Sequence, residues 1–423
     1  MNAQAPGVAV PGWRGLIGGF GLLAVAEIVA RLLGLASVVT MAHVLGPDGL
    51  GIIVLGMTLV AYAAIGVDAG TELLAVRDLG RSPERLRSIV EPVLGLRLAI
   101  ALMLGSLLVV VALVVGAGSN NAETVALFAL ALPALALNPR FMAVAVRASG
   151  GVAIGNITGQ LVLLLGVLAL VGSGDTTTVA LLVAGGEFAY ALVVLGVLAR
   201  RHGMLRPHVD IASWRGTLQL SGPLLGYGIA RAAIYSADVL LIGVLLGAAE
   251  AGQYGAAYKP VLLVSGGMGL FYVSLLAALG DGAEGGRHLA RKALRIIPPF
   301  VLAGAVTMSA SAPLTIPLAF GEEFTPAVPV LAVLAFTLPI QAAGGAYFCL
   351  LVAAGRQRTL LRINAAGAAA NVLANLAVIP LLGIVGAAGV TVTTELLVQL
   401  SARRAAIRGG LADFALVRSA PRT

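Results

Sequence analysis

Long apolar segments separated by short polar connections run through this sequence from end to end. Segments of about 20 residues are long enough to cross the hydrocarbon core of a bilayer as helices. The alternating pattern of a membrane barrel, the other backbone arrangement that lipid allows, is absent from them. The pattern therefore predicts an all-α polytopic membrane protein with about twelve helices, placed near residues 16–44, 51–75, 92–116, 124–148, 152–171, 178–199, 217–246, 253–279, 296–320, 328–353, 359–380 and 386–403.

One stretch of sequence occurs twice. Trp13-Arg14-Gly15 opens the first apolar segment and Trp214-Arg215-Gly216 opens another, at an offset of 201 residues (214 − 13). The glycines that end the two segments keep the same offset, at positions 46 and 247 and again at 51 and 252. A shared register near the midpoint favours a duplicated half. The alternative is that glycine-rich apolar helices resemble one another by chance.

The duplication divides the chain into two six-helix bundles. Residues 1–203 form the expected N-terminal bundle, and residues 204–423 form the expected C-terminal bundle with a short cytoplasmic tail. Because six crossings return the chain to its starting side, both halves enter the membrane from the same side. Such repeats are parallel and related by an axis along the membrane normal.

Charge alternates between the connections. Every second connection carries arginine or lysine. In the others, all the charged residues are acidic: Asp48, Glu123, Asp175, Glu250, Glu322 and Glu323. By the positive-inside rule, the basic connections and both termini are cytoplasmic. The expected location is the bacterial cytoplasmic (inner) membrane, with the first apolar segment kept as a helix and not cleaved as a signal peptide.

Composition supports this class. Hydrophobic residues make up 59% of the chain, charged residues 11%, and the mean hydropathy is +1.00. The net charge of +8 comes from arginines gathered in short loops, so it predicts no nucleic-acid partner. With Cys349 as the single cysteine and no ligand spacing among the four histidines, neither a metal site nor a cofactor is expected.

Ionisable residues inside the apolar segments are the candidates for function, because each is costly to place in a bilayer. Glu27 and Arg31 are four residues apart and can pair, whereas Asp68 and Glu72 are like charges at the same spacing. One of those two acids is then protonated, or a cation or an arginine lies between them. The alternative is a patch at the cytoplasmic end that is neutralised by Arg77 or by another helix. Arg97 is expected to reach the cytoplasmic face. The basic candidates for substrate binding are Arg31, Arg231, Arg140 and Lys259, and the acidic candidates for ion coupling, with H⁺ or Na⁺, are Glu27, Asp68, Glu72 and Asp238.

Several stretches resemble polysaccharide-export flippases of the multidrug/oligosaccharidyl-lipid/polysaccharide superfamily. The first is Ala42-His43-Val44-Leu45-Gly46-Pro47-Asp48-Gly49-Leu50-Gly51. The second half matches more specifically, at residues 235–243 (YSADVLLIG) and 251–258 (AGQYGAAY), with looser similarity at 321–324, 371–376 and 379–388. The resemblance covers almost the whole chain, in loose patterns of small and apolar residues.

The resemblance implies two six-helix bundles around a central cavity that opens alternately to each side. Its cargo would be an isoprenoid-pyrophosphate-linked oligosaccharide used for surface polysaccharide, with membrane lipid and polysaccharide assembly proteins as candidate partners. Arg31 and Arg231, on the equivalent helix of each half, are then expected to converge on this cavity and bind the pyrophosphate. The alternative is a structural role, in which the two arginines pair with Glu187, Asp238 or Glu395.

Two other functions stay open. A cation-coupled multidrug antiporter of the same fold would favour an acidic cavity. A membrane-embedded glycan-modifying enzyme would need reactive groups at a membrane face and usually a large outer loop, and the predicted outer loops are short. We therefore expect a transporter with no catalytic residues.

Overall fold

The computed structural model describes residues 13–81, 85–115, 120–146, 148–280 and 284–411, and every regular element within them is a helix. The predicted tail after residue 411 lies outside the described residues. The N-terminal half contains α1 (Trp13–Asp68), α2 (Thr71–Arg81), α3 (Leu86–Val115), α4 (Asn120–Leu127), η2 (Phe128–Leu130), α5 (Ala131–Leu137), α6 (Arg140–Ala145), α7 (Ser149–Leu170) and α8 (Thr176–His202). The C-terminal half contains α9 (Ile211–Leu245), α10 (Ala248–Gly280), α11 (Glu284–Phe320), η3 (Glu322–Phe324), α12 (Ala327–Leu334), α13 (Thr337–Ala353) and α14 (Gln357–Arg408).

Nine helical stretches among the described residues are long and apolar enough to cross a membrane, which confirms the predicted class. Two of them are far longer than one crossing requires: Val25–Asp68 has 44 residues and Gln357–Arg408 has 52. At 1.5 Å per residue these stretches would be about 66 and 78 Å long if they were straight, against a hydrocarbon core of about 30 Å. Helix α10, which contains the predicted helix 253–279, is not among the nine. The number of twelve crossings therefore stays a prediction.

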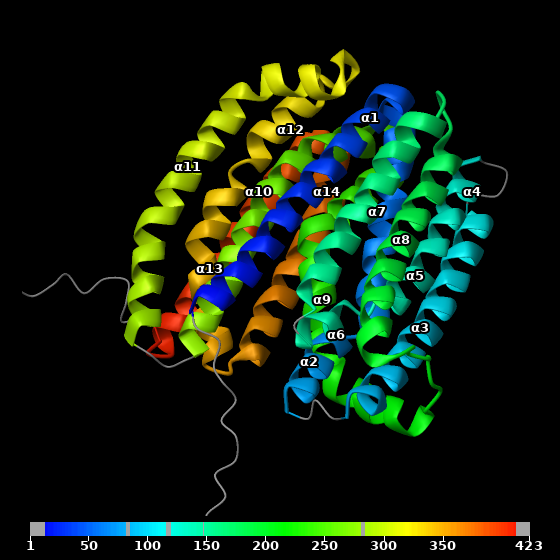
Figure 1. Ribbon diagram of the computed structural model, residues 1–423. Helices are drawn as coiled ribbons and strands as arrows, with labels where there is room; N and C mark the ends of the chain where they lie inside the picture. Colours follow the sequence, from blue (N-terminus) through cyan, green and yellow to red (C-terminus); the bar gives the residue numbers. More distant parts are fainter. Residues whose placement is uncertain (1–12, 82–84, 116–119, 147, 281–283, 412–423) are drawn as a thin grey trace, which may run out of the picture.

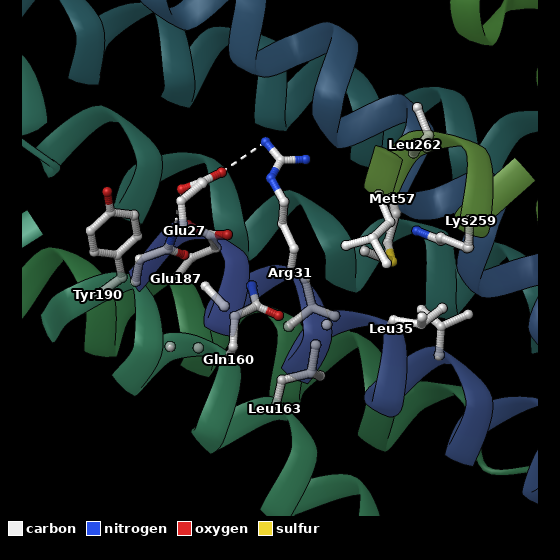
Figure 2. A pocket seen from close by; sticks show the side chains of 18 residues that line it. Glu27, Arg31, Leu35, Met57, Gln160, Leu163, Glu187, Tyr190, Lys259 and Leu262 are labelled. Carbon is white, nitrogen blue, oxygen red and sulfur yellow. Dashed lines mark hydrogen bonds and ion pairs between the residues drawn. The ribbon is translucent and has the colours of Figure 1, made fainter. Parts of the chain in front are cut away.

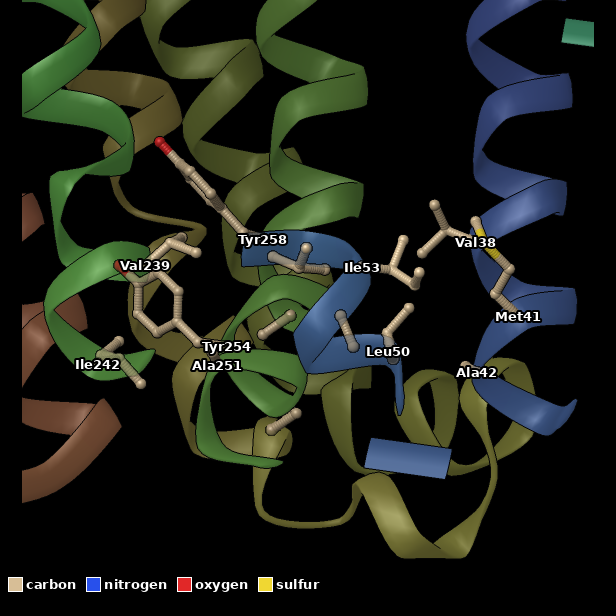
Figure 3. Close-up of a cluster of buried hydrophobic side chains, with 14 of the residues drawn as sticks. Val38, Met41, Ala42, Leu50, Ile53, Val239, Ile242, Ala251, Tyr254 and Tyr258 are labelled. Carbon is tan, nitrogen blue, oxygen red and sulfur yellow. The ribbon is translucent and has the colours of Figure 1, made fainter. Parts of the chain in front are cut away.

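The two longest helices each contain a sharp turn at a glycine. In α1 it is Gly46, with φ 66°, and in α14 it is Gly383, with φ 60°. Residues with a side chain avoid these positive φ values, so glycine allows the chain to turn back at these points. In Figure 3, Val38 and Met41 on the first arm of α1 lie across from Leu50 and Ile53 on the second. The predicted helix pairs 16–44 and 51–75, and 359–380 and 386–403, are thus the arms of two hairpins.

Three predicted helices are interrupted. The helix expected at 51–75 stops at Asp68, because Ala69 and Gly70 both have positive φ, and α2 starts anew after them. The one expected at 124–148 divides into four pieces, the last break falling at Asn138, which is extended as residues before proline tend to be. The one expected at 328–353 divides at Ala335 and Phe336 into α12 and α13.

The helices are arranged as two groups, with α1 passing between them (Figure 1). Helices α3 to α8 lie on one side and α11 to α14 on the other. Helix α1 packs against both α7 and α10, and α9 packs mainly against α14. Buried residues of α1 and α10, including Leu50, Ile53, Tyr254 and Tyr258, belong to the largest apolar cluster of the protein (Figure 3).

The repeated glycines meet at the turn of α1. A side chain at Gly51 would overlap the carbonyl oxygen of Ala248, and a side chain at Gly252 would overlap that of Pro47. These partners keep the 201-residue offset found in the sequence, since 252 − 51 and 248 − 47 both equal 201. We call this the reciprocal glycine contact. It brings the backbones of α1 and α10 together at this end of the bundle.

Candidate functional site

The first cavity lies between α1, α7, α8 and α10 and has a volume of about 370 Å³. Glu27, Arg31, Leu35 and Val38 follow one another at helical spacing, so α1 presents them on one face. Helices α7 and α8 approach closely behind it, because a methyl group on Gly159 would lie 2.7 Å from the carbonyl oxygen of Gly186. The other polar side chains of the wall are those of Asn156, Gln160, Glu187, Tyr190 and Lys259 (Figure 2).

Arg31 is only partly satisfied in this cavity. Its Nη2 atom lies 2.8 Å from Oε1 of Glu27, whose Oε2 accepts a hydrogen bond of 3.1 Å from Asn156. The Nε atom of Arg31 is buried and has no hydrogen-bond partner. The guanidinium also lies against α10, where a side chain at Gly266 would overlap it. Arg31 therefore lines the cavity with a guanidinium whose hydrogen-bonding capacity is not filled.

Lys259 and Glu187 complete the charged lining. Figure 2 shows Lys259 reaching towards Met57 from α10, while Glu187 lies on the side of Glu27 and Tyr190. Among the described residues, neither Lys259 nor Glu187 takes part in an ion pair. Two cations and two acids thus share this cavity, with only one of each joined directly.

The second cavity, of about 260 Å³, contains Arg231. One guanidinium nitrogen of Arg231 donates to the hydroxyl of Tyr235 at 2.8 Å, and the guanidinium carbon lies 4.4 Å from the centre of that ring. Tyr235 donates in turn to Glu395 at 3.0 Å, and Gln399 donates to the same carboxylate at 2.8 Å. Glu395 is fully buried, and its second oxygen has no partner. Arg231 is thus linked to Glu395 through Tyr235.

The expected convergence of the two arginines takes a different form. Arg31 and Arg231 line separate cavities, and α10 contributes to both. Residues 259, 262 and 263 of α10 face the first cavity, whereas residues 265, 268, 269, 272 and 276 face the second. Arg31 packs against Gly266, directly beside Ser265 of the second cavity. Helix α10 is the wall between them.

Asp238 lies in a third place, within the protein interior. Its carboxylate is fully buried and accepts hydrogen bonds from Tyr254, from Thr391 at 2.9 Å and from the backbone nitrogen of Val239. On the first arm of α14, Asn371 and Asn375 are also fully buried. Asn375 donates to Asn371 at 3.0 Å, which leaves Asn371 Nδ2 and Asn375 Oδ1 without partners.

Asp68, Glu72 and Arg140 are not among the residues that line either cavity. Asp68 pairs with Arg97 and also accepts hydrogen bonds from the backbone nitrogens of Gly70 and Glu72, each at 3.1 Å. Arg97 is only 4% exposed, so the expectation that it reaches the membrane face is wrong. Of the alternatives for the two close acids, an arginine beside Asp68 is the one observed.

Sequence reasoning missed the polar side chains that surround the charges. Asn156, Gln160 and Tyr190 line the first cavity, and Gln399 lines the second. Amides and tyrosines carry no charge penalty in an apolar helix, so nothing separates them from packing residues by sequence alone. Glu187 and Glu395 did stand out as acids within apolar segments and as alternative partners for the two arginines, but the link from Arg231 to Glu395 through Tyr235 did not.

Comparison with known proteins gives the family. The sequence profile of the family described as "Polysaccharide biosynthesis protein" matches residues 16–276. No curated protein sequence shows a significant match.

Solved structures share the fold at low sequence identity. An inward closed conformation of the lipid II flippase MurJ is 14% identical, with a TM-score of 0.73, over 91% of this chain and 87% of that one. An inward-facing multidrug resistance transporter of the MATE family is 15% identical, with a TM-score of 0.71, over 90% and 95%. A transporter from Pyrococcus furiosus belongs to the multidrug/oligosaccharidyl-lipid/polysaccharide superfamily and is described as having a binding pocket of reverse polarity. It is 14% identical, with a TM-score of 0.63, over 94% of this chain and 96% of that one. The chain therefore belongs to the polysaccharide biosynthesis protein family, and it shares its multi-pass membrane fold with transporters of the multidrug/oligosaccharidyl-lipid/polysaccharide superfamily.

Proposed function

We propose that this protein moves an isoprenoid-pyrophosphate-linked oligosaccharide across the cytoplasmic membrane by alternating access, without making or breaking a bond. The observation that carries the proposal is the first cavity, where Arg31 has an unpartnered buried Nε and Lys259 has no ion pair among the described residues. A pyrophosphate provides acceptors for both cations, and a guanidinium suits phosphate oxygens well. Asn156, Gln160 and Tyr190 offer hydrogen bonds and an aromatic face to a sugar.

The charges of the same cavity bear on the choice between this function and multidrug transport. A cationic drug would be attracted by Glu27 and Glu187, but Glu27 is already paired with Arg31. The neighbouring Lys259 would repel a cation further. Lys259, which has no ion pair among the described residues, therefore supports an anionic cargo, whereas Glu187 is the acid that a cationic drug would use.

Ion coupling is a second part of the proposal, and we assign it to Asp238. This carboxylate is fully buried, is bonded to Tyr254 and Thr391, and does not line either cavity. A carboxylate in such a place costs less when a proton or a sodium ion accompanies it. Glu27 is the alternative acid, because it lies in the first cavity beside Arg31, whereas Asp68 already has Arg97.

The test measures transport of a lipid-linked oligosaccharide in proteoliposomes, together with surface glycan in cells and protein abundance in the membrane. Arg31→Ala and Lys259→Ala should each lower transport at normal abundance, and Arg31→Lys should rescue it only in part, because lysine lacks the fork of donors. Arg404→Ala, an exposed arginine outside both cavities, is the matched control. Asp238→Asn should retain transport but lose its dependence on a proton or sodium gradient.

Normal transport by Arg31→Ala and Lys259→Ala would contradict the cargo assignment. Uptake of a cationic drug, abolished by Glu187→Gln, would favour the antiporter instead. Equal transport with and without gradients, in the parent protein and in Asp238→Asn, would remove the coupling role.

A further inference from the structure

A third hollow lies on the surface of the C-terminal half that would face lipid, between α11, α13 and the second arm of α14. Its volume is about 590 Å³, larger than either cavity described above. Most of its lining is apolar, and Leu302, Phe336 and Leu396 are 45%, 36% and 43% exposed. In a membrane protein such exposed apolar side chains face lipid. We call this hollow the α11–α13–α14 groove.

One end of the groove is cationic. Arg295 of α11 and Arg403 of α14 both line it, and both lie on the side of the bundle predicted to be cytoplasmic. Neither forms an ion pair with any described residue, and the Nε atom of Arg403 is buried without a hydrogen-bond partner. An arginine left without an ion pair in this way is costly in a bilayer unless an acceptor from outside the protein binds its guanidinium.

The length of the groove indicates which kind of molecule could supply that acceptor. From Arg295 to Leu302, and from Arg403 back to Leu396, each helix wall runs seven residues along the axis, or about 10 Å. An anion fits at the arginine end, and a flexible hydrocarbon chain fits along the remainder. Basic pockets between helices near the cytoplasmic surface are the places where anionic lipid head groups bind.

We propose that the α11–α13–α14 groove is a binding site for one anionic phospholipid of the cytoplasmic leaflet. The phosphate binds Arg403 and Arg295, and one acyl chain lies along Leu302, Ile340 and Leu396. This site is separate from the cargo cavity, and it stands whether or not the proposed cargo is right.

The groove is also adjacent to the second cavity. Gln399 lines both spaces, donates a hydrogen bond to Glu395 and packs against Gly344 of α13. A lipid in the groove therefore contacts the same side chain that holds Glu395 in the Arg231 network. Lipid binding would stabilise this arrangement of α13 and α14.

The experiment uses the full chain in a neutral detergent and compares phosphatidylglycerol with phosphatidylcholine of the same acyl chains. Native mass spectrometry gives the bound lipid, and thermal unfolding gives the stabilisation. We expect one tightly retained phosphatidylglycerol and little retained phosphatidylcholine. Arg403→Gln and Arg295→Gln should each weaken phosphatidylglycerol binding about fivefold, as expected for one arginine near an anionic head group.

Two further variants separate charge from shape. Arg404→Gln removes an exposed arginine that is next in sequence but does not line the groove, and it should bind phosphatidylglycerol like the parent protein. Ala343→Phe fills the groove from an exposed position of α13 and leaves both arginines in place, so it should also weaken phosphatidylglycerol binding.

Four results would overturn the proposal. The first is equal retention of phosphatidylglycerol and phosphatidylcholine by the parent protein, and the second is an undiminished preference for phosphatidylglycerol in the Arg295→Gln/Arg403→Gln double variant. The third is thermal stabilisation by inorganic phosphate that survives Ala343→Phe. The fourth is binding of a polyprenyl phosphate alone in preference to phosphatidylglycerol. The last would make the groove a site for the cargo's own tail.

Discussion

The position of Arg31 depends on a residue that has no side chain. Its guanidinium occupies the space beside Gly266 of α10, while Gly267, the next residue, has open space around its Cα. Gly266→Ala should displace the guanidinium and separate it from Glu27 without removing either charge. We expect transport to fall several-fold at unchanged abundance. Gly267→Ala is the matched control and should transport normally, since alanine is the better helix former. Loss of transport in both variants would show that α10 tolerates no substitution here, and Arg31 would not be the cause.

At the scale of single residues, the sequence predicts which groups are costly but not which groups satisfy them. Glu27 and Arg31 pair as their spacing in one helix predicts. Arg97 pairs with Asp68, 29 positions away, and packs over the ring of Phe141. That arrangement depends on where the end of α1, α3 and α6 meet, which helical periodicity does not determine. The division of Arg31 and Arg231 between two cavities depends likewise on the position of α10.

At the scale of helices, apolar length predicts where the chain lies in the membrane, but not where a helix turns or breaks. Gly383 has φ 60°, whereas Gly389, in the following arm of α14, is helical and has open space around it. A residue with a side chain held in this sparsely populated backbone conformation costs about 1–3 kcal/mol, so Gly383→Ala should lower the free energy of unfolding by about that amount. Gly389→Ala should be neutral or slightly stabilising. Thermal unfolding in detergent measures both, and equal stability of the two variants would contradict a required turn at Gly383.

The breaks in the predicted helices have local causes that were present in the sequence but weak there. Asn138 precedes a proline, and the pair Ala69 and Gly70 precedes α2, whose first turn Asp68 caps. Many other glycines and prolines in this chain lie inside continuous helices, such as Pro92, Pro260 and Pro298. Residue type alone therefore does not separate a break from a tolerated proline, because neighbouring helices decide which backbone groups are satisfied.

At the scale of the whole molecule, the two groups of helices are joined most closely by α1 and α10. The reciprocal glycine contact allows their backbones to touch at one end. Gly51→Ala and Gly252→Ala should each force this end apart, and the two variants should have similar effects because they add the same atom at equivalent positions. A cysteine at Pro47 should react faster with an impermeant thiol reagent in both variants, with Cys349 replaced beforehand. Gly185→Ala, a helical position with open space, is the control. A large effect from one glycine and none from the other would contradict the equivalence.

The reciprocal glycine contact has the form of an isologous dimer interface, in which residue i of one subunit meets residue j of the other, and j meets i. Here Gly51 meets Ala248 and Gly252 meets Pro47, within one polypeptide. On the duplication that the 201-residue offset predicts, a half-length ancestor would have made this contact with a second copy of itself. Fusion would then have let the two sides diverge, and the glycines of this contact are among the positions that still match. The glycines still match between the two halves, whereas the surroundings of the arginines differ. Arg31 forms an ion pair with Glu27, and Arg231 donates a hydrogen bond to Tyr235.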